Sequence, residues 1–210
     1  MAVICRGDVV LFQGDSITDA GRRSSPDGLG SGYVSIVRGW LASAHPDLEI
    51  QVLNRGVGGD RTQELLSRWK EDCVAIRPHV LSLMIGVNDV WRKKGEWNGQ
   101  TYIPLPDYRR NLSMLLDRAE AAGIRQLVLM SPTTIEPEND GELNTLLGAY
   151  DAAVREEAAR RGSAYVPARQ KLMEIRERMT DVAWTREGCH PTTAGHTVLA
   201  QAWLEAVGLA

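Results

Sequence analysis

The chain has 210 residues, of which 43% are hydrophobic and 24% charged, and its formal net charge is −3 at pH 7. These values are typical of a soluble globular protein and predict one domain over residues 1–210. Because the chain is slightly acidic and has no run of Lys or Arg, it lacks the basic stripe that binds nucleic acid or an anionic membrane surface.

Short apolar runs alternate with longer amphipathic stretches along the chain. The apolar runs predict buried strands at residues 9–12, 50–53, 80–85, 127–130 and 164–166. Helical spacing of apolar residues predicts helices over about 62–76, 107–122, 142–161 and 193–207. Strands buried on both faces and separated by helices indicate an α/β fold with a parallel sheet. Residues 92–106 show no clear period, and so long a loop is typical of a functional or disordered segment.

Polar residues cluster where the predicted strands end. Asp15-Ser16 follows the first strand, Gly58-Gly59-Asp60 the second and Asn88-Asp89 the third, while Glu187 to Pro191 precede the last helix. Ligands bind beyond the carboxyl ends of the strands in an open parallel sheet, so these residues predict a site. Each stretch alone is equally consistent with a helix cap or a turn. Their joint occurrence in this order is not explained by capping alone.

Four of these stretches resemble the signature blocks of the GDSL/SGNH hydrolases. They are Gly14-Asp15-Ser16, Gly59 in its Gly-Gly-Asp turn, the Gly-x-Asn-Asp stretch at 86–89, and His190-Pro191. The surrounding sequence at residues 12–19, 30–34, 68–72, 85–92 and 194–200 is similar to that of a subgroup of intracellular acetylxylan esterases. The resemblance implies a single-domain three-layer sandwich with a parallel five-stranded, flavodoxin-like sheet, and a serine esterase activity.

The resemblance also implies roles for particular residues. Ser16 is the expected nucleophile and His190 its general base, because an imidazole with a pKa near 6.5 suits proton transfer at neutral pH. The expected oxyanion hole consists of the backbone N–H groups of Ser16 and Gly59 and the side-chain amide of Asn88. Of the other histidines, His45 and His79 should lie at the far end of the sheet, and His196 should be a structural or surface residue of the last helix.

The third member of the triad departs from the family pattern. The family places an aspartate three residues before the histidine, whereas this chain has Glu187 there. A glutamate can still orient the imidazole, so we predict Glu187 as the acid, on a reshaped loop. Asp181 is a more distant alternative. A backbone carbonyl that orients His190 without any acid is another.

Two further groups of residues near the expected site have simple interpretations. Cys189 adjoins His190, but adjacent side chains rarely point the same way, so we interpret it as a small space-filling residue. Asp15, Asp60 and Asp89 suggest a metal, yet no second histidine converges on them. We interpret these aspartates as caps and hydrogen-bond partners, and expect neither a metal nor a cofactor.

The class of substrate is predicted from aromatic residues near the site and from the resemblance to the acetylxylan esterase subgroup. Trp91, Trp97 and Tyr102 border the long loop and suit stacking on sugar rings, although packing or a subunit interface would need the same side chains. The expected substrate is a small ester, an acetylated sugar, and a homo-oligomer is a further expectation. The alternatives are a broad short-chain carboxylesterase or thioesterase, and a carbohydrate-binding protein without activity.

The compartment is predicted from the first residues and the cysteines. The start, Met1 to Asp8, has no basic stretch followed by an apolar one, so we expect no secretory signal. The longest apolar runs are too short to cross a membrane. Cys5, Cys73 and Cys189 are odd in number and widely spaced, which favours a reducing compartment. We therefore predict a cytoplasmic protein.

Overall fold

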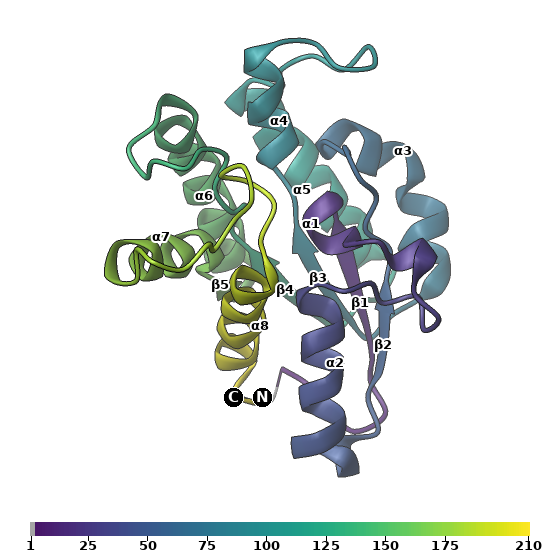
Figure 1. Ribbon diagram of the computed structural model, residues 1–210. Helices are drawn as coiled ribbons and strands as arrows, with labels where there is room; N and C mark the ends of the chain where they lie inside the picture. The colour runs from purple at the N-terminus through teal and green to yellow at the C-terminus, as the bar shows by residue number, and fades with distance from the viewer. Residues whose placement is uncertain (1–2) are drawn as a thin grey trace.

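The computed structural model describes residues 3–210 and is built around one parallel sheet (Figure 1). Its strands are β1 (Val9–Gly14), β2 (Gln51–Asn54), β3 (Val80–Met84), β4 (Gln126–Met130) and β5 (Ala164–Val166). They pair in the order β2-β1-β3-β4-β5, and every pair is parallel. The predicted α/β fold with a five-stranded, flavodoxin-like sheet is confirmed.

Helices cover both faces of this sheet. They are α1 (Ser16–Asp19), α2 (Tyr33–Ala44), α3 (Thr62–Asp72), α4 (Val87–Trp91), α5 (Leu105–Ala121), α6 (Glu142–Arg161), α7 (Ala168–Arg178) and α8 (Thr193–Val207). Helix α8 contacts α2 and α7, whereas α5 contacts α3 and α6 on the opposite face. The result is the predicted three-layer sandwich (Figure 1). Within residues 3–210, no helix is both long and apolar enough to cross a bilayer.

The boundaries of the elements differ from the sequence-based expectations in a few places. The helix predicted over 62–76 ends at Asp72, because the backbone of Cys73 leaves helical angles (φ −135°, ψ −65°) before a 3-10 turn at Val74–Ile76. Helices α2 and α7 had not been predicted. In α7 only Ala168 and Leu172 are buried, which leaves too few apolar positions for a visible period.

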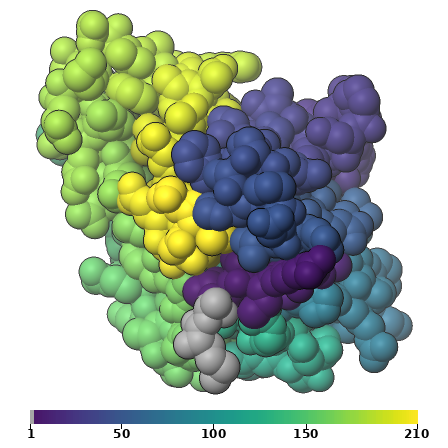
Figure 2. All heavy atoms as spheres, turned by 90° about the horizontal axis from the view of Figure 1, so that it is seen from below, coloured from purple at the N-terminus to yellow at the C-terminus, as the bar shows by residue number. Residues whose placement is uncertain are grey.

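The sheet topology explains where a site can form. From β1 the chain moves to β2 on one side and then returns to β3 on the other, so the loops after β1 and β3 diverge at the carboxyl end of the sheet. Figure 2 views the molecule from below, toward the opposite end of the sheet, where α2 (blue) and α8 (yellow) lie side by side. His79 lies toward that end, where its Nδ1 accepts a hydrogen bond from the N–H of Val9 at 2.9 Å.

His196 joins α8 to α2 and is a structural residue. It is buried, and its Nδ1 accepts a hydrogen bond from the N–H of Tyr33, the first residue of α2, at 3.2 Å. The two rings stack with their centroids 6.4 Å apart. Burial lowers the pKa of His196 to about 4, since a charged imidazole would lose its water.

We expect this histidine to make the fold sensitive to acid. The unfolded chain binds the His196 proton near pH 6.5 and the folded chain near pH 4, so the stabilisation is present above pH 6.5 and is lost as the pH falls toward 4. The free energy of unfolding should lose on the order of 3 kcal/mol from this group alone. Urea unfolding at several pH values should therefore show a flatter dependence in His196→Gln than in the wild type.

Other groups, such as Asp15, make the free energy of unfolding depend on pH in the opposite direction. Because these groups are present in both proteins, the difference between His196→Gln and the wild type reports on His196 alone. Parallel curves for wild type and His196→Gln would show that His196 does not titrate as proposed.

Candidate active site

A serine and a histidine from opposite ends of the chain meet at the carboxyl edge of the sheet. Ser16 begins α1 directly after β1, and His190 precedes α8. The Oγ of Ser16 lies 2.9 Å from the Nε2 of His190. This is hydrogen-bonding distance, so the imidazole can accept the hydroxyl proton of Ser16.

The turn that presents Ser16 is fixed by close packing and by side-chain hydrogen bonds. A Cβ on Gly14 would lie 2.3 Å from the carbonyl oxygen of Met84, so only glycine allows β1 to end so close to β3. The carboxylate of Asp15 caps α1 by accepting from the N–H of Ile17 at 3.0 Å. These contacts place Ser16 on a rigid element, as a nucleophile requires.

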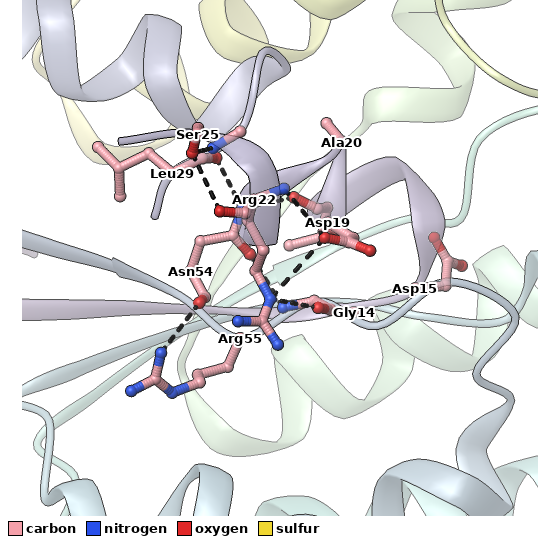
Figure 3. Close-up of polar contacts among 12 residues, drawn as sticks. Gly14, Asp15, Asp19, Ala20, Arg22, Ser25, Leu29, Asn54 and Arg55 are labelled. Carbon is pink, nitrogen blue, oxygen red and sulfur yellow. Dashed lines mark hydrogen bonds and ion pairs between the residues drawn. The ribbon is translucent and has the colours of Figure 1, made fainter. Parts of the chain in front are cut away.

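A second set of contacts ties the loop after β2 to the same turn (Figure 3). The side-chain amide of Asn54 donates to the carbonyl oxygens of Thr18 and Leu29 at 2.7 and 2.8 Å. The Nε of Arg22 donates to the carbonyl oxygen of Gly56 at 2.6 Å. The two strand-end loops therefore form one connected unit.

Glu187 reaches His190 on the side of the ring that faces away from Ser16. Its carboxylate hydrogen-bonds the Nδ1 of His190 and accepts from the N–H of the same residue at 3.3 Å. Partial burial acts to raise the pKa of Glu187, but the hydrogen bond and charge of His190 outweigh it, and the pKa lies below its usual value. An ionised Glu187 holds the imidazole in the tautomer with a proton on Nδ1, which leaves Nε2 free to accept.

A tight loop joins Glu187 to His190. The N–H of Arg186 donates to the carbonyl oxygen of His190 at 2.8 Å, which closes the loop tightly. Gly188 has φ +89°, and a Cβ there would lie 2.3 Å from the backbone of Glu136. Only glycine fits this position, since it tolerates both the positive φ and the close approach.

Gly59 and Asn88 complete the set of polar groups around Ser16. Gly59 adopts φ +84° in the loop after β2. The Nδ2 of Asn88 donates one hydrogen bond to the carbonyl oxygen of Asp60 at 3.0 Å, which orients the amide and leaves its second N–H for another acceptor. Ser16, Gly59, Asn88 and His190 all line one cleft of about 520 Å³.

Two of the three predicted aromatic residues lie in this cleft. Trp91 and Trp97 line it, and the Trp91 ring centroid lies 6.0 Å from that of His190. Tyr102, the third, does not line this cleft. Its hydroxyl accepts a hydrogen bond from the Tyr150 hydroxyl at 3.1 Å, and it lines a separate hollow beside α5.

The buried aspartates near the site make hydrogen bonds or ion pairs with other residues of the protein. Burial raises the pKa of Asp15 to about 7 and that of Asp89 to about 6, although Asp89 accepts hydrogen bonds from the N–H and hydroxyl of Thr62. Asp60 pairs with Arg68 at 2.7 Å. Each aspartate thus has a structural partner.

Cys189 is a buried thiol beside two polar side chains. Glu187, Cys189 and His190 offer donor atoms within 4.8 Å of one another. Burial raises the pKa of the Cys189 thiol well above its usual value, so the thiol is protonated in this environment. Its 1% exposure agrees with a space-filling role.

A larger hollow, of about 650 Å³, lies on the outer side of the loop that carries His190. Gly188 and Arg186 contribute to its wall, together with Trp184 and the end of α7. We assign the site to the smaller cleft because Ser16 and His190 face each other there.

The three-layer fold and the serine–histidine pair define a hydrolase that uses an activated serine. The chain belongs to the GDSL-like lipase/acylhydrolase family, whose model matches residues 12–198. It is accordingly a carboxylic ester hydrolase.

Similar proteins include an acetylxylan esterase and an alpha/beta hydrolase. The acetylxylan esterase of Geobacillus stearothermophilus is 34% identical over 209 residues, covering 96% of this chain and 94% of the relative. The crystal structure of that enzyme, Axe2, superposes with a TM-score of 0.89 at 33% identity, over 98% of this chain and 96% of the other. LAE5, an alpha/beta hydrolase from the metagenome of Lake Arreo in Spain, has a TM-score of 0.90 at 28% identity, over 100% and 99%.

Proposed function

We propose that this esterase removes acetyl groups from acetylated xylo-oligosaccharides or related sugars, with Ser16 as nucleophile and His190 as general base. The observation that supports this most directly is the 2.9 Å contact between Ser16 Oγ and His190 Nε2 at the floor of an aromatic cleft. We also propose that residues 1–210 form a single hydrolase domain.

The reaction proceeds through an acyl-enzyme. His190 takes the hydroxyl proton as Ser16 Oγ attacks the carbonyl carbon of the ester, and the carbonyl oxygen becomes an oxyanion. The N–H groups of Ser16 and Gly59 and the free N–H of Asn88 stabilise this charge. The C–O bond to the sugar then breaks, and the sugar oxygen receives the proton from His190. Water, deprotonated by His190, then attacks the carbonyl carbon of the acyl-enzyme. The bond to Ser16 Oγ breaks, acetate leaves, and His190 returns the proton to Ser16.

Glu187 is the proposed acid of the triad. Solved catalytic mutants of Axe2 replace a serine, an aspartate and a histidine by alanine, and that aspartate stands three residues before that histidine. Glu187 stands three residues before His190 and hydrogen-bonds its Nδ1. The carboxylate therefore has the position and the contact that the role requires.

The acetylated sugar is favoured over other esters by the relatives and by the cleft. Axe2 is described as an acetylxylan esterase and as an acetyl-xylooligosaccharide esterase. Trp91 and Trp97 offer aromatic surface beside the Ser16 hydroxyl, on which a pyranose ring can stack. A cytoplasmic location is proposed from the three free cysteines, and a homo-oligomer from the exposed aromatic surface of Trp97.

The test compares three acetyl donors under identical conditions: acetylated xylo-oligosaccharide, 4-nitrophenyl acetate and acetyl-CoA. We expect the highest kcat/KM for the sugar ester. A clear preference for acetyl-CoA or for longer acyl esters would replace the sugar assignment with a thioesterase or a broad carboxylesterase. Binding of the sugar ester without turnover of any ester would support the non-catalytic alternative.

A further inference from the structure

The segment after α4, which the sequence predicted only as a functional or disordered loop, contains a tight hairpin. Trp97 and Gln100 exchange backbone hydrogen bonds of 3.2 and 2.9 Å. Between them, Asn98 and Gly99 have φ +50° and +75°, as a two-residue type I′ turn requires. This hairpin projects at the top of Figure 1, just after α4. It is therefore an ordered element rather than a loose connection.

Arg92, at the base of this hairpin, joins the hairpin to the loop after β2. Its Nε and Nη2 both donate to the Oε1 of Gln100, at 3.0 and 2.8 Å. Its guanidinium lies over the indole of Trp97, 4.8 Å from the ring centroid. Its Nη2 also donates to the carbonyl oxygen of Gly59 at 3.4 Å. One side chain thus contacts the hairpin and the loop of a predicted oxyanion donor.

Trp97 itself packs directly on Gly59. A Cβ on Gly59 would lie 2.7 Å from the Cζ3 atom of Trp97, so the edge of the indole rests against the glycine backbone. Half of Trp97 nevertheless stays exposed, at 50%, in the wall of the cleft. Arg61 provides a second anchor, since its Nη1 donates to the carbonyl oxygen of Thr101 at 2.5 Å. The hairpin and the Gly59 loop are therefore held as one unit.

We propose that Arg92 is a positioning residue that couples a sugar-binding wall, formed by Trp97, to the oxyanion loop at Gly59. The inference rests on the proposed function, because the ligand of the wall is a pyranose ring that carries an acetyl ester. The guanidinium holds the indole from one face, so the exposed side of Trp97 is ready to stack on the sugar. The same guanidinium fixes the peptide next to the N–H that binds the oxyanion.

The contacts of Arg92 with Trp97 and with Gly59 should affect different kinetic constants. Loss of Arg92 frees Trp97, which weakens binding of the sugar ester but not of 4-nitrophenyl acetate, since the latter has no pyranose ring. Loss of the contact with Gly59 loosens one oxyanion donor, which lowers kcat for both esters. A residue with a merely structural role would change neither quantity selectively.

The experiment measures kcat and KM for both esters in Arg92→Met, Trp97→Ala and the double variant. Arg92→Met should raise KM for the acetylated xylo-oligosaccharide up to about tenfold, the size of an aromatic stacking contact. KM for 4-nitrophenyl acetate should stay within about twofold, while kcat falls about fivefold for both, less than the 10²-fold loss of a complete oxyanion donor. In the Trp97→Ala background, Arg92→Met should lower kcat without raising the sugar KM further.

Lys93→Met is the matched control, because it removes the same charge from the neighbouring residue. Lys93 pairs with Glu142 at 3.5 Å and not with the hairpin, so both sets of constants should remain at wild-type values. Arg92→Lys keeps the charge but loses the paired bonds to Gln100, and its sugar KM should lie between those of wild type and Arg92→Met.

The inference is overturned if Arg92→Met behaves like Lys93→Met. It is equally overturned if KM for both esters rises in parallel with a loss of thermal stability, which would indicate a structural role. The proposed function fails separately, before any variant is made, if the wild type cleaves 4-nitrophenyl acetate but not the sugar ester; the sugar-binding wall then falls with it.

Discussion

Ser16→Ala should reduce kcat/KM for 4-nitrophenyl acetate by roughly 10⁴- to 10⁶-fold, because the attacking oxygen and the covalent intermediate are both removed. The fold should persist. Ser16 is only partly buried, and its helix remains capped by Asp15. Steady-state hydrolysis measures the loss, and thermal unfolding should give a midpoint close to that of the wild type.

Ser16 and His190 act as one unit, so their variants should not be additive. His190→Ala alone should cost about as much as Ser16→Ala, and the double variant should be no slower than either. Ser67→Ala is the matched control, since Ser67 is an exposed serine whose hydroxyl bonds only the carbonyl oxygen of Glu64 at 2.6 Å. It should keep full activity. Strictly multiplicative losses, or turnover by Ser16→Ala near the wild-type rate, would refute a serine nucleophile.

A covalent probe tests independently whether Ser16 is the nucleophile. A sulfonyl fluoride, which sulfonylates the oxygen of an activated serine with loss of fluoride, should add one mass increment to the wild type and none to Ser16→Ala. Labelling of Ser16→Ala at the same rate would place the reactive hydroxyl elsewhere.

The sheet and the residues at its carboxyl edge could be predicted from sequence because each is encoded locally. Buried strands such as β3 are mostly apolar, and the residues that follow them in a parallel sheet must converge on one edge. Ser16, Gly59 and Asn88 lie in such loops, so the chain order of the motifs was enough to bring them together.

The walls of the cleft could not be predicted in the same way. Asn98-Gly99 is a strong signal for a two-residue hairpin, and it was present in the sequence, yet the flanking residues show no strand alternation to draw attention to it. The hairpin reverses the chain, which puts Trp97 in the cleft and sends Tyr102 toward Tyr150 on α6. The contact of Arg92 with Gly59 and the burial of His196 depend on partners far away in the sequence, for which a single sequence has no local signal.

The acid of the triad is the point at which the sequence departs from the family and the structure supplies a physical argument. Glu187→Ala should lower kcat by about 10²- to 10⁴-fold, because His190 loses the group that selects its tautomer and stabilises its charged form. Both side chains are partly exposed, at 46% for Glu187 and 40% for His190, so water can replace part of the interaction. We therefore expect a smaller loss than for Ser16→Ala.

Three companion variants make the assignment specific. Glu187→Gln keeps the size but not the charge and should lose most of the activity. Glu187→Asp restores the charge on a side chain one methylene shorter; because Gly188 and the Arg186 to His190 hydrogen bond fix the loop for the longer residue, we expect only partial rescue. Asp181→Ala, which removes the other candidate acid, should keep wild-type kcat. If Asp181→Ala were the inactive variant and Glu187→Ala active, the acid would be Asp181; if both were active, a backbone carbonyl would orient His190. These variants together test whether the hydrogen bond between the Glu187 carboxylate and the Nδ1 of His190 orients the imidazole during the reaction.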